Sequence, residues 1–101
     1  MERNSRAARI QRKLERGRQH QQAGRLAEAE RAYQKAQGLN AEDLLLHYNL
    51  AALYALWGKK PEAVEWLKKA LEADRQKVAG WLATDPMFDG LKGDPEYESL
   101  L

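Results

Sequence analysis

The sequence predicts an all-α protein, and three observations support this fold class. Only seven glycines and three prolines occur in 101 residues, whereas the strong helix formers Ala, Leu, Glu, Lys, Arg and Gln dominate the composition. Apolar side chains recur at helical spacing along much of the chain. A 34-residue repeat then relates two successive pairs of helical segments. Antiparallel helical hairpins are therefore the expected building units.

The beginning of the chain is strongly basic. Residues 1–25 contain eight Arg or Lys and two Glu, which gives a net charge of +6. Residues 26–101 contain nine Arg or Lys and thirteen Asp or Glu, which gives a net charge of −4. Residues 1–9 are interpreted as a basic arm, as is common at chain ends. Within this arm, Ser5 is suited to cap a helix that starts near Arg6.

Two helices are expected to follow this arm. Residues 7–23 have helical periodicity, although several positions that would face a core carry charged or polar side chains. Gly24 is expected to end this helix, because a left-handed cap is most easily adopted without a Cβ. Residues 26–39 form a clearly amphipathic pattern that places Ala29 and Tyr33 on its buried face.

The stretch from His47 to Ala70 predicts the most regular hairpin of the chain. Its first half is almost entirely apolar, and Tyr54 shares a helical face with neighbouring apolar positions. Gly58 ends this helix, and Pro61 begins the next one at a position where a missing N–H costs nothing. The second helix buries one apolar stripe that includes Leu67.

The two hairpins are related by a shift of 34 residues without gaps. Several identical pairs share this register: Gly24 and Gly58, Glu28 and Glu62, Ala29 and Ala63, Lys35 and Lys69, and Ala36 and Ala70. A period of 34 with two helices in each unit resembles the tetratricopeptide repeat. The second unit matches the family pattern well with His47, Leu50, Ala51, Tyr54, Ala63 and Leu67. The first unit keeps the small residues and the turn glycine. At the places of His47, Leu50 and Tyr54, however, it has the polar residues Lys13, Arg16 and His20.

The resemblance implies a short right-handed α-solenoid of stacked hairpins with capping helices. Residues 10–43 would form the first repeat, with a degenerate first helix, and residues 44–77 the second. Each repeat buries its apolar face only against a neighbouring repeat, so the last repeat of a short array leaves one face uncovered. Residues 78–101 are expected to cover that face as a cap. Asp85-Pro86 and Asp94-Pro95 each predict the start of a short helix, because Asp is a good N-cap and Pro suits the first helical position.

In this family, binding occurs mainly on the concave surface formed by the first helix of each hairpin. The resemblance therefore implies a site for a peptide or a partner helix on this surface, at Leu14, Arg18, Gln21, Leu45, Tyr48, Asn49, Ala52 and Leu56. Asn49 stands where family members that hold an extended peptide often place an asparagine. A non-enzymatic adaptor that binds a protein or peptide is the leading functional hypothesis.

Two alternatives remain open at this stage. Arg9, Arg12 and Arg16 fall on one stripe of the first helix and could contact an anionic partner, which would indicate a nucleic-acid- or ribosome-associated factor. No aromatic residue lies in residues 1–25 to stack on bases. Alternatively, the imperfect first helix could pair two copies of the chain in a homodimeric, self-assembling scaffold.

Nothing in the sequence indicates catalysis, a metal site or a cofactor. The chain has no cysteine, its two histidines fall at packing positions of the repeat, and no known catalytic motif is present. The longest apolar run has eight residues, against about 20 needed to span a bilayer. A cytoplasmic protein without a membrane contact is expected.

Overall fold

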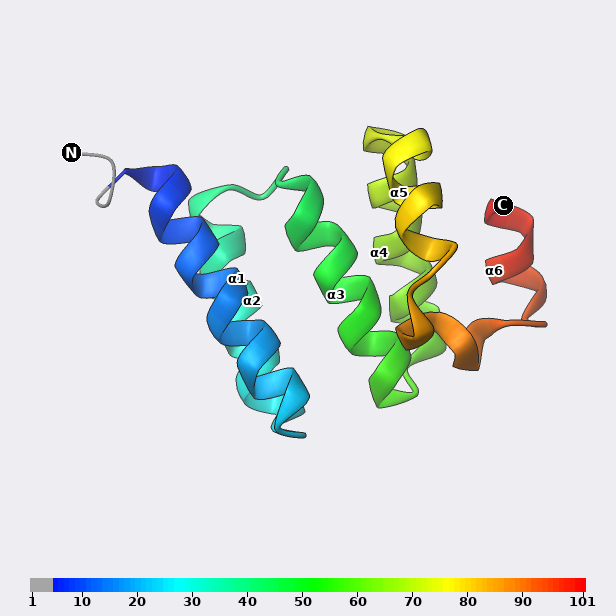
Figure 1. The fold of residues 1–101 in the computed structure, drawn as a ribbon, viewed down its shortest axis with the longest axis horizontal. Coiled ribbons are helices and arrows are strands. Elements are labelled where there is room, and N and C mark those ends of the chain that lie inside the picture. Colours follow the sequence, from blue (N-terminus) through cyan, green and yellow to red (C-terminus); the bar gives the residue numbers. More distant parts are fainter. Residues whose placement is uncertain (1–4) are drawn as a thin grey trace.

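A computed structural model describes residues 5–101, which form consecutive helices and no strand (Figure 1). Residues 1–4, which belong to the expected basic arm, lie outside the described residues. The helical elements are α1 (Arg6–Gln22), α2 (Leu26–Leu39), α3 (Leu44–Trp57), α4 (Lys60–Ala73), α5 (Arg75–Leu82), the 3₁₀-helix η2 (Pro86–Leu91) and α6 (Pro95–Leu100). The predicted all-α fold class is confirmed.

Most of the helices, though not α2 and α4, begin where a short polar side chain satisfies one of the first backbone N–H groups. The Ser5 hydroxyl accepts a hydrogen bond from the Ala8 N–H at 3.1 Å, so the predicted cap of α1 is confirmed. The Asp43 carboxylate accepts from the Leu46 N–H at 2.9 Å at the start of α3. Asp85 and Asp94 cap η2 and α6 in the same way, as the Asp-Pro pairs predict.

The turns of the two hairpins have the same geometry. Gly24 and Gly58 adopt φ values of +80° and +79°, in the left-handed region that favours glycine. The N–H of the residue after each glycine donates to a carbonyl five positions earlier, to His20 at 2.8 Å and to Tyr54 at 2.9 Å. The 34-residue shift in the sequence is therefore reproduced in the backbone hydrogen bonds of the turns.

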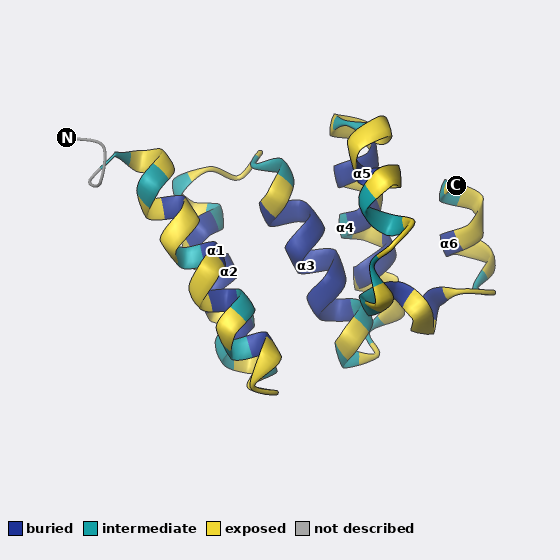
Figure 2. Cartoon of the chain, in the orientation of Figure 1, coloured by how far each residue is buried: buried dark blue, intermediate teal, exposed yellow. Residues whose placement is uncertain are grey.

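Each hairpin packs its two helices together, α1 with α2 and α3 with α4, and α2 connects the hairpins by packing against α3. Helix α3 lies at the centre, and every residue from 46 to 54 is buried (Figure 2). Ala29, Ala51 and Ala63 have no exposed surface, which is consistent with small residues allowing the helices of a hairpin to approach closely.

The segment after α4 wraps around the second hairpin instead of continuing as a regular repeat. Helices α5 and α6 pack against α4, whereas η2 packs against α3. Val78 of α5, Phe88 of η2 and Tyr97 of α6 are almost completely buried. Each of these short elements therefore contributes at least one anchoring side chain to the apolar core, and η2 adds Leu91 as a second.

Candidate functional site

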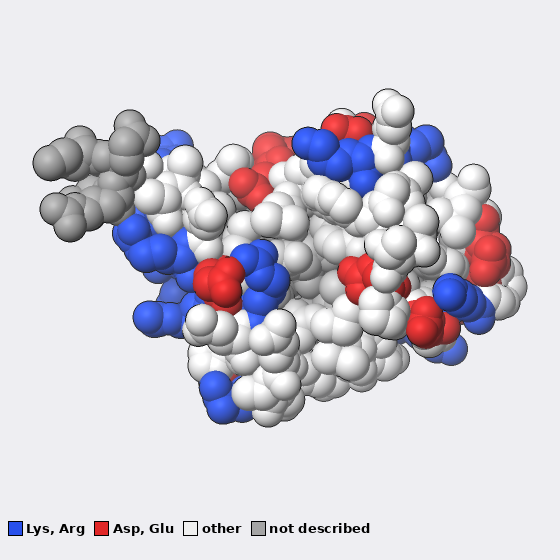
Figure 3. Space-filling model, viewed as in Figure 1, with Lys and Arg blue, Asp and Glu red and all other residues white. Residues whose placement is uncertain are grey.

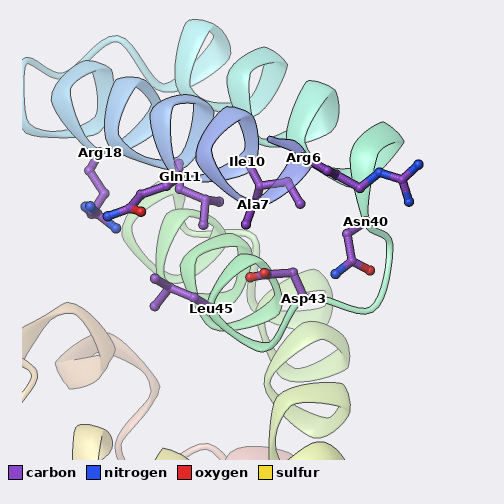
Figure 4. Close-up of a pocket in the computed structure, with 9 residues that line it drawn as sticks. Arg6, Ala7, Ile10, Gln11, Arg18, Asn40, Asp43 and Leu45 are labelled. Atoms are coloured by element: carbon purple, nitrogen blue, oxygen red, sulfur yellow. The ribbon is translucent and has the colours of Figure 1, made fainter. Parts of the chain in front are cut away.

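The first candidate site is the groove between α1 and α3, the first helices of the two hairpins. Its wider part is a hollow of about 410 Å³. Ile10 and Leu14 of α1 and Leu45 of α3 supply its apolar lining, as the close-up in Figure 4 shows for Ile10 and Leu45 on opposite sides. Leu45 is exposed, whereas Ile10 and Leu14 are buried. Together they present an apolar floor that remains open to solvent.

Polar side chains stand at the two ends of this hollow. Arg6 and Asn40 lie at one end and Arg18 at the other (Figure 4). Arg18 forms an ion pair with Glu15, one helical turn earlier on α1. The Asp43 carboxylate, which also lines the hollow, already accepts a backbone hydrogen bond as the cap of α3. The hollow thus combines an apolar floor with cationic side chains at both ends.

A second, smaller hollow of about 120 Å³ continues the groove toward η2 and shares Arg18 with the first. Its walls include Gln21 of α1 and Asn49 of α3. The Gln21 side-chain oxygen accepts a hydrogen bond from the Tyr33 hydroxyl at 3.0 Å. The Asn49 side chain is 7% exposed, and its Nδ2 group has no hydrogen-bond partner within residues 5–101. An unpaired buried amide N–H is rare in native proteins, and Nδ2 itself has almost no exposed surface in this structure.

The C-terminal segment closes the far end of this groove on Tyr48. The Tyr48 hydroxyl donates to the Asp85 carboxylate at 2.5 Å. Its ring packs against Trp81 with a centroid distance of 4.9 Å, and against Phe88 at 5.4 Å. Tyr48 therefore binds the protein's own C-terminal segment, and the open part of the groove lies between Leu45 and Asn49.

The groove brings together most of the residues that the resemblance implies for a concave site. Leu14, Arg18 and Leu45 line the larger hollow, and Arg18, Gln21, Tyr48, Asn49 and Ala52 line the smaller one. Leu56 is exposed near the end of α3 and lines neither hollow.

The structure also adds residues that the sequence analysis does not include. Ile10 and Ala7 line the groove one and two turns before Leu14, so helical periodicity alone could have found them. Asp85 and Met87 come from the C-terminal segment, and no local pattern places that segment beside α1 and α3.

The arginines considered for an anionic partner lie elsewhere. Arg12 and Arg16 line a separate hollow between α1 and α2, and Arg9 is exposed about one helical turn earlier on α1. This position separates the cationic stripe from the α1–α3 groove.

The described part of the chain offers little for catalysis or metal binding. Residues 5–101 contain no group of three His, Asp or Glu side chains that could hold a metal ion. The His47 Nε2 atom lies 2.7 Å from the Ala41 carbonyl oxygen, and its ring packs on Trp66. His47 thus has a packing role. None of the described helices is both long and apolar enough to cross a membrane.

All four tyrosines, Tyr33, Tyr48, Tyr54 and Tyr97, are buried and have raised pKa values. Burial is the main cause for Tyr48, whose pKa is raised further by the hydrogen bond to Asp85. Burial also raises the pKa of Tyr33. The pKa of Tyr54 is raised by burial and by its hydrogen bond to the Glu30 carboxylate at 2.7 Å.

These shifts predict that the protein loses stability above about pH 10, the ordinary pKa of tyrosine. The unfolded chain releases the tyrosine protons first, so the stabilising effect is complete below this pH and is lost as pH rises toward the folded-state pKa. The midpoint of urea unfolding, measured from pH 8 to pH 12, should fall in the alkaline part of this range. A Tyr33→Phe variant should show a smaller decrease, and an equal decrease would contradict this account.

Comparison with known proteins supports the repeat interpretation for the second hairpin. Residues 45–77 match the family model described as a tetratricopeptide repeat. The match covers α3 and α4 and continues into α5. Searches of curated proteins and of solved structures found no match. The arrangement of consecutive packed helices fits a repeat of this type.

Proposed function

Because residues 45–77 form a tetratricopeptide-type repeat, a module generally associated with protein–protein interaction, we propose that this protein binds an extended segment of a partner protein in the α1–α3 groove. The observation that carries the proposal is the Asn49 Nδ2 group. Leaving a buried donor unpaired costs about 1–3 kcal/mol. A peptide carbonyl placed in the smaller hollow would supply the missing acceptor once the Asn49 side chain rotates toward the hollow.

The spacing of the groove suggests what the bound segment looks like. Leu45 and Asn49 are one helical turn apart, a rise of about 6 Å along α3. Two residues of an extended chain span a similar distance, at about 3.3 Å per residue. A carbonyl accepting from Asn49 would therefore place an apolar side chain, two residues away, over Leu45 and Ile10.

The charged ends of the larger hollow add a preference for acidic partners. Arg6 and Arg18 stand at its opposite ends. An Asp or Glu flanking the apolar residue would lie near one of these guanidinium groups, which bind carboxylates well. We expect the preferred segment to contain a bulky apolar residue with an acidic neighbour.

A displayed library of random linear peptides provides the test, with the wild-type protein as bait. We expect selected peptides to be enriched in apolar–acidic pairs and to perturb the NMR signals of Leu14, Leu45 and Asn49. Asn49→Ala should weaken their binding about tenfold, as expected for one buried hydrogen bond. Because Asn49 Nδ2 is unpaired in the free protein, the same substitution should leave the thermal midpoint unchanged or slightly higher.

Leu56→Ala provides the matched control, since Leu56 is an exposed leucine on the same helix but outside both hollows. This variant should bind selected peptides as tightly as the wild type. Leu45→Glu should abolish binding by placing a carboxylate on the apolar floor. Peptides that bind Leu45→Glu and Asn49→Ala normally would contradict the proposal. Light scattering at several concentrations would show whether a homodimer competes for the same surface.

A further inference from the structure

A third hollow, of about 310 Å³, lies between α1 and α2. Cations from both helices line it: Arg12, Lys13 and Arg16 from α1, and Arg31 and Lys35 from α2. Figure 3 shows Lys and Arg side chains gathered over α1 at the left end of the molecule. The sequence indicates the stripe on α1, but the packing of the hairpin adds the two cations of α2. We refer to this surface as the basic cleft.

The basic cleft carries much more positive than negative charge. Glu28 is the carboxylate in its lining, and it pairs with Arg31 at 3.2 Å. No ion pair joins Lys13, Arg16 or Lys35 to a carboxylate within residues 5–101. Like charges held together on one helix face destabilise the helix, so folding alone does not explain this cluster. A polyanion would relieve the repulsion.

His20 adds a ring N–H donor to the same surface. The Arg25 Nε–H donates to the His20 Nδ1 atom at 3.0 Å. An imidazole whose Nδ1 accepts a hydrogen bond carries its proton on Nε2. Because His20 lines the basic cleft, this arrangement provides an N–H group besides the guanidinium and ammonium groups. Such a mixture suits the oxygen atoms of phosphate groups.

We propose that the basic cleft binds the phosphate backbone of a double-stranded nucleic acid. Guanidinium groups one helical turn apart on α1, with cations of α2 opposite them, can contact successive phosphates. Residues 1–25 contain no Phe, Tyr or Trp, and Tyr33 of α2 is completely buried. The cleft therefore lacks the stacking platform on which single-stranded recognition depends, and contacts with the backbone alone predict binding without sequence preference.

Other polyanions fit the basic cleft less well. The exposed large apolar residues of the described chain are Leu45, Leu56 and Leu101, and none of them lines the cleft. An anionic membrane would normally also receive apolar side chains from an amphipathic surface. The cleft also lies apart from the α1–α3 groove, although both use α1. Binding of a nucleic acid is therefore independent of the proposed peptide function.

The test measures binding of a mixed-sequence DNA duplex, and of the RNA duplex of the same sequence, over a range of salt concentrations. With about four phosphate contacts, the logarithm of the affinity should fall with the logarithm of salt concentration with a slope near −3.6. The triple variant Lys13→Gln/Arg16→Gln/Lys35→Gln should bind more than about thirtyfold more weakly at low salt. Its slope should be shallower by about 2.7, or about 0.9 for each lost contact.

A matched control separates a local site from general charge. Lys60→Gln/Lys68→Gln/Lys77→Gln changes the net charge by the same amount at exposed positions outside the basic cleft. This control should lose less than about threefold in affinity, the scale of a non-local charge effect. Glutamine is a good helix former, so the control should keep the wild-type thermal midpoint. The triple variant should keep or exceed it, because it loses like-charge repulsion within the cleft. Lys35→Gln alone, on α2, tests the cleft if the triple variant unfolds.

Several results would overturn the proposal. These are an absence of duplex binding at low salt, an equal loss of affinity in the triple variant and its control, and tighter binding of the single strands than of the duplexes. Vesicles containing phosphatidylserine provide the last comparison. Retention on these vesicles without duplex binding would assign the cleft to a membrane surface instead.

Discussion

Gly17→Ala is expected to destabilise the protein by about 2 kcal/mol, although alanine is the better helix former. Helix propensity alone would favour alanine by about 1 kcal/mol. A Cβ atom at Gly17, however, would lie 2.2 Å from Cε1 and 2.6 Å from Cδ1 of Tyr33. Overpacking of this kind costs about 1–3 kcal/mol and occasionally more, so the steric cost should exceed the gain in propensity.

Tyr33 cannot easily move away from the added methyl group. Its side chain has no exposed surface, and its hydroxyl donates to the Gln21 side chain at 3.0 Å. Rotating the ring would break this buried hydrogen bond and open a void elsewhere in the hairpin. For a domain of this size, a loss of 2 kcal/mol corresponds to a decrease of about 10 °C in the thermal midpoint, which calorimetry or circular dichroism would detect.

Gly38→Ala is the control for this prediction. Gly38 is also helical, but a Cβ atom there would meet no heavy atom within 4 Å. This substitution should stabilise the protein slightly, by up to about 1 kcal/mol. Equal effects at Gly17 and Gly38 would mean that Tyr33 does not pack on α1 as described.

The second repeat suggests a substitution that should partly rescue Gly17→Ala. At the positions equivalent to Gly17 and Tyr33 it has Ala51 and Leu67, which are both buried. A larger residue on the first helix is thus paired with a smaller one on the second. Gly17→Ala/Tyr33→Leu should therefore be less destabilised than the sum of the single variants, by at least about 1 kcal/mol. Strict additivity would argue against the contact.

These pairs show why so much of the fold could be predicted from the sequence. The 34-residue register assigns each packing position of the first hairpin to its equivalent in the second, as Gly17 to Ala51 and Tyr33 to Leu67. The turn glycines Gly24 and Gly58 and the Asp85 and Asp94 caps are local signals, because each depends on backbone groups only a few residues away. Repeat architecture makes most contacts local or between neighbours.

The sites could be predicted only in part, because they depend on contacts between elements. Most residues of the concave surface followed from the repeat register. The basic cleft did not, since Arg31 and Lys35 face Arg16 only once α1 and α2 have packed. The contact between Tyr48 and the segment around η2 could not be predicted either, because it joins residues far apart in the sequence. Residues 83–94 carry no periodicity that indicates the helix against which they pack.

Phe88→Ala is expected to have the largest effect on stability, a loss of about 3–4 kcal/mol. Phe88 is one of the largest side chains without appreciable exposure, and truncating such a phenylalanine removes its apolar burial and leaves a cavity. Its ring also lies 5.4 Å from that of Tyr48, and such aromatic pairs contribute about 0.5–1.5 kcal/mol beyond the buried area. A domain with 5–15 kcal/mol of total stability would lose a large share of it.

The same substitution tests whether η2 belongs to the cooperative core. Phe88 joins η2 to α3 through Tyr48, whose ring also packs against Trp81 of α5. Phe88→Leu, which keeps most of the volume, should cost less than about 1.5 kcal/mol. In Phe88→Ala, urea unfolding should show one transition at a lower midpoint, together with a reduced near-ultraviolet signal from Tyr48 and Trp81. An unchanged midpoint with the same loss of aromatic signal would instead mean that η2 detaches alone, and that the two hairpins are stable without it.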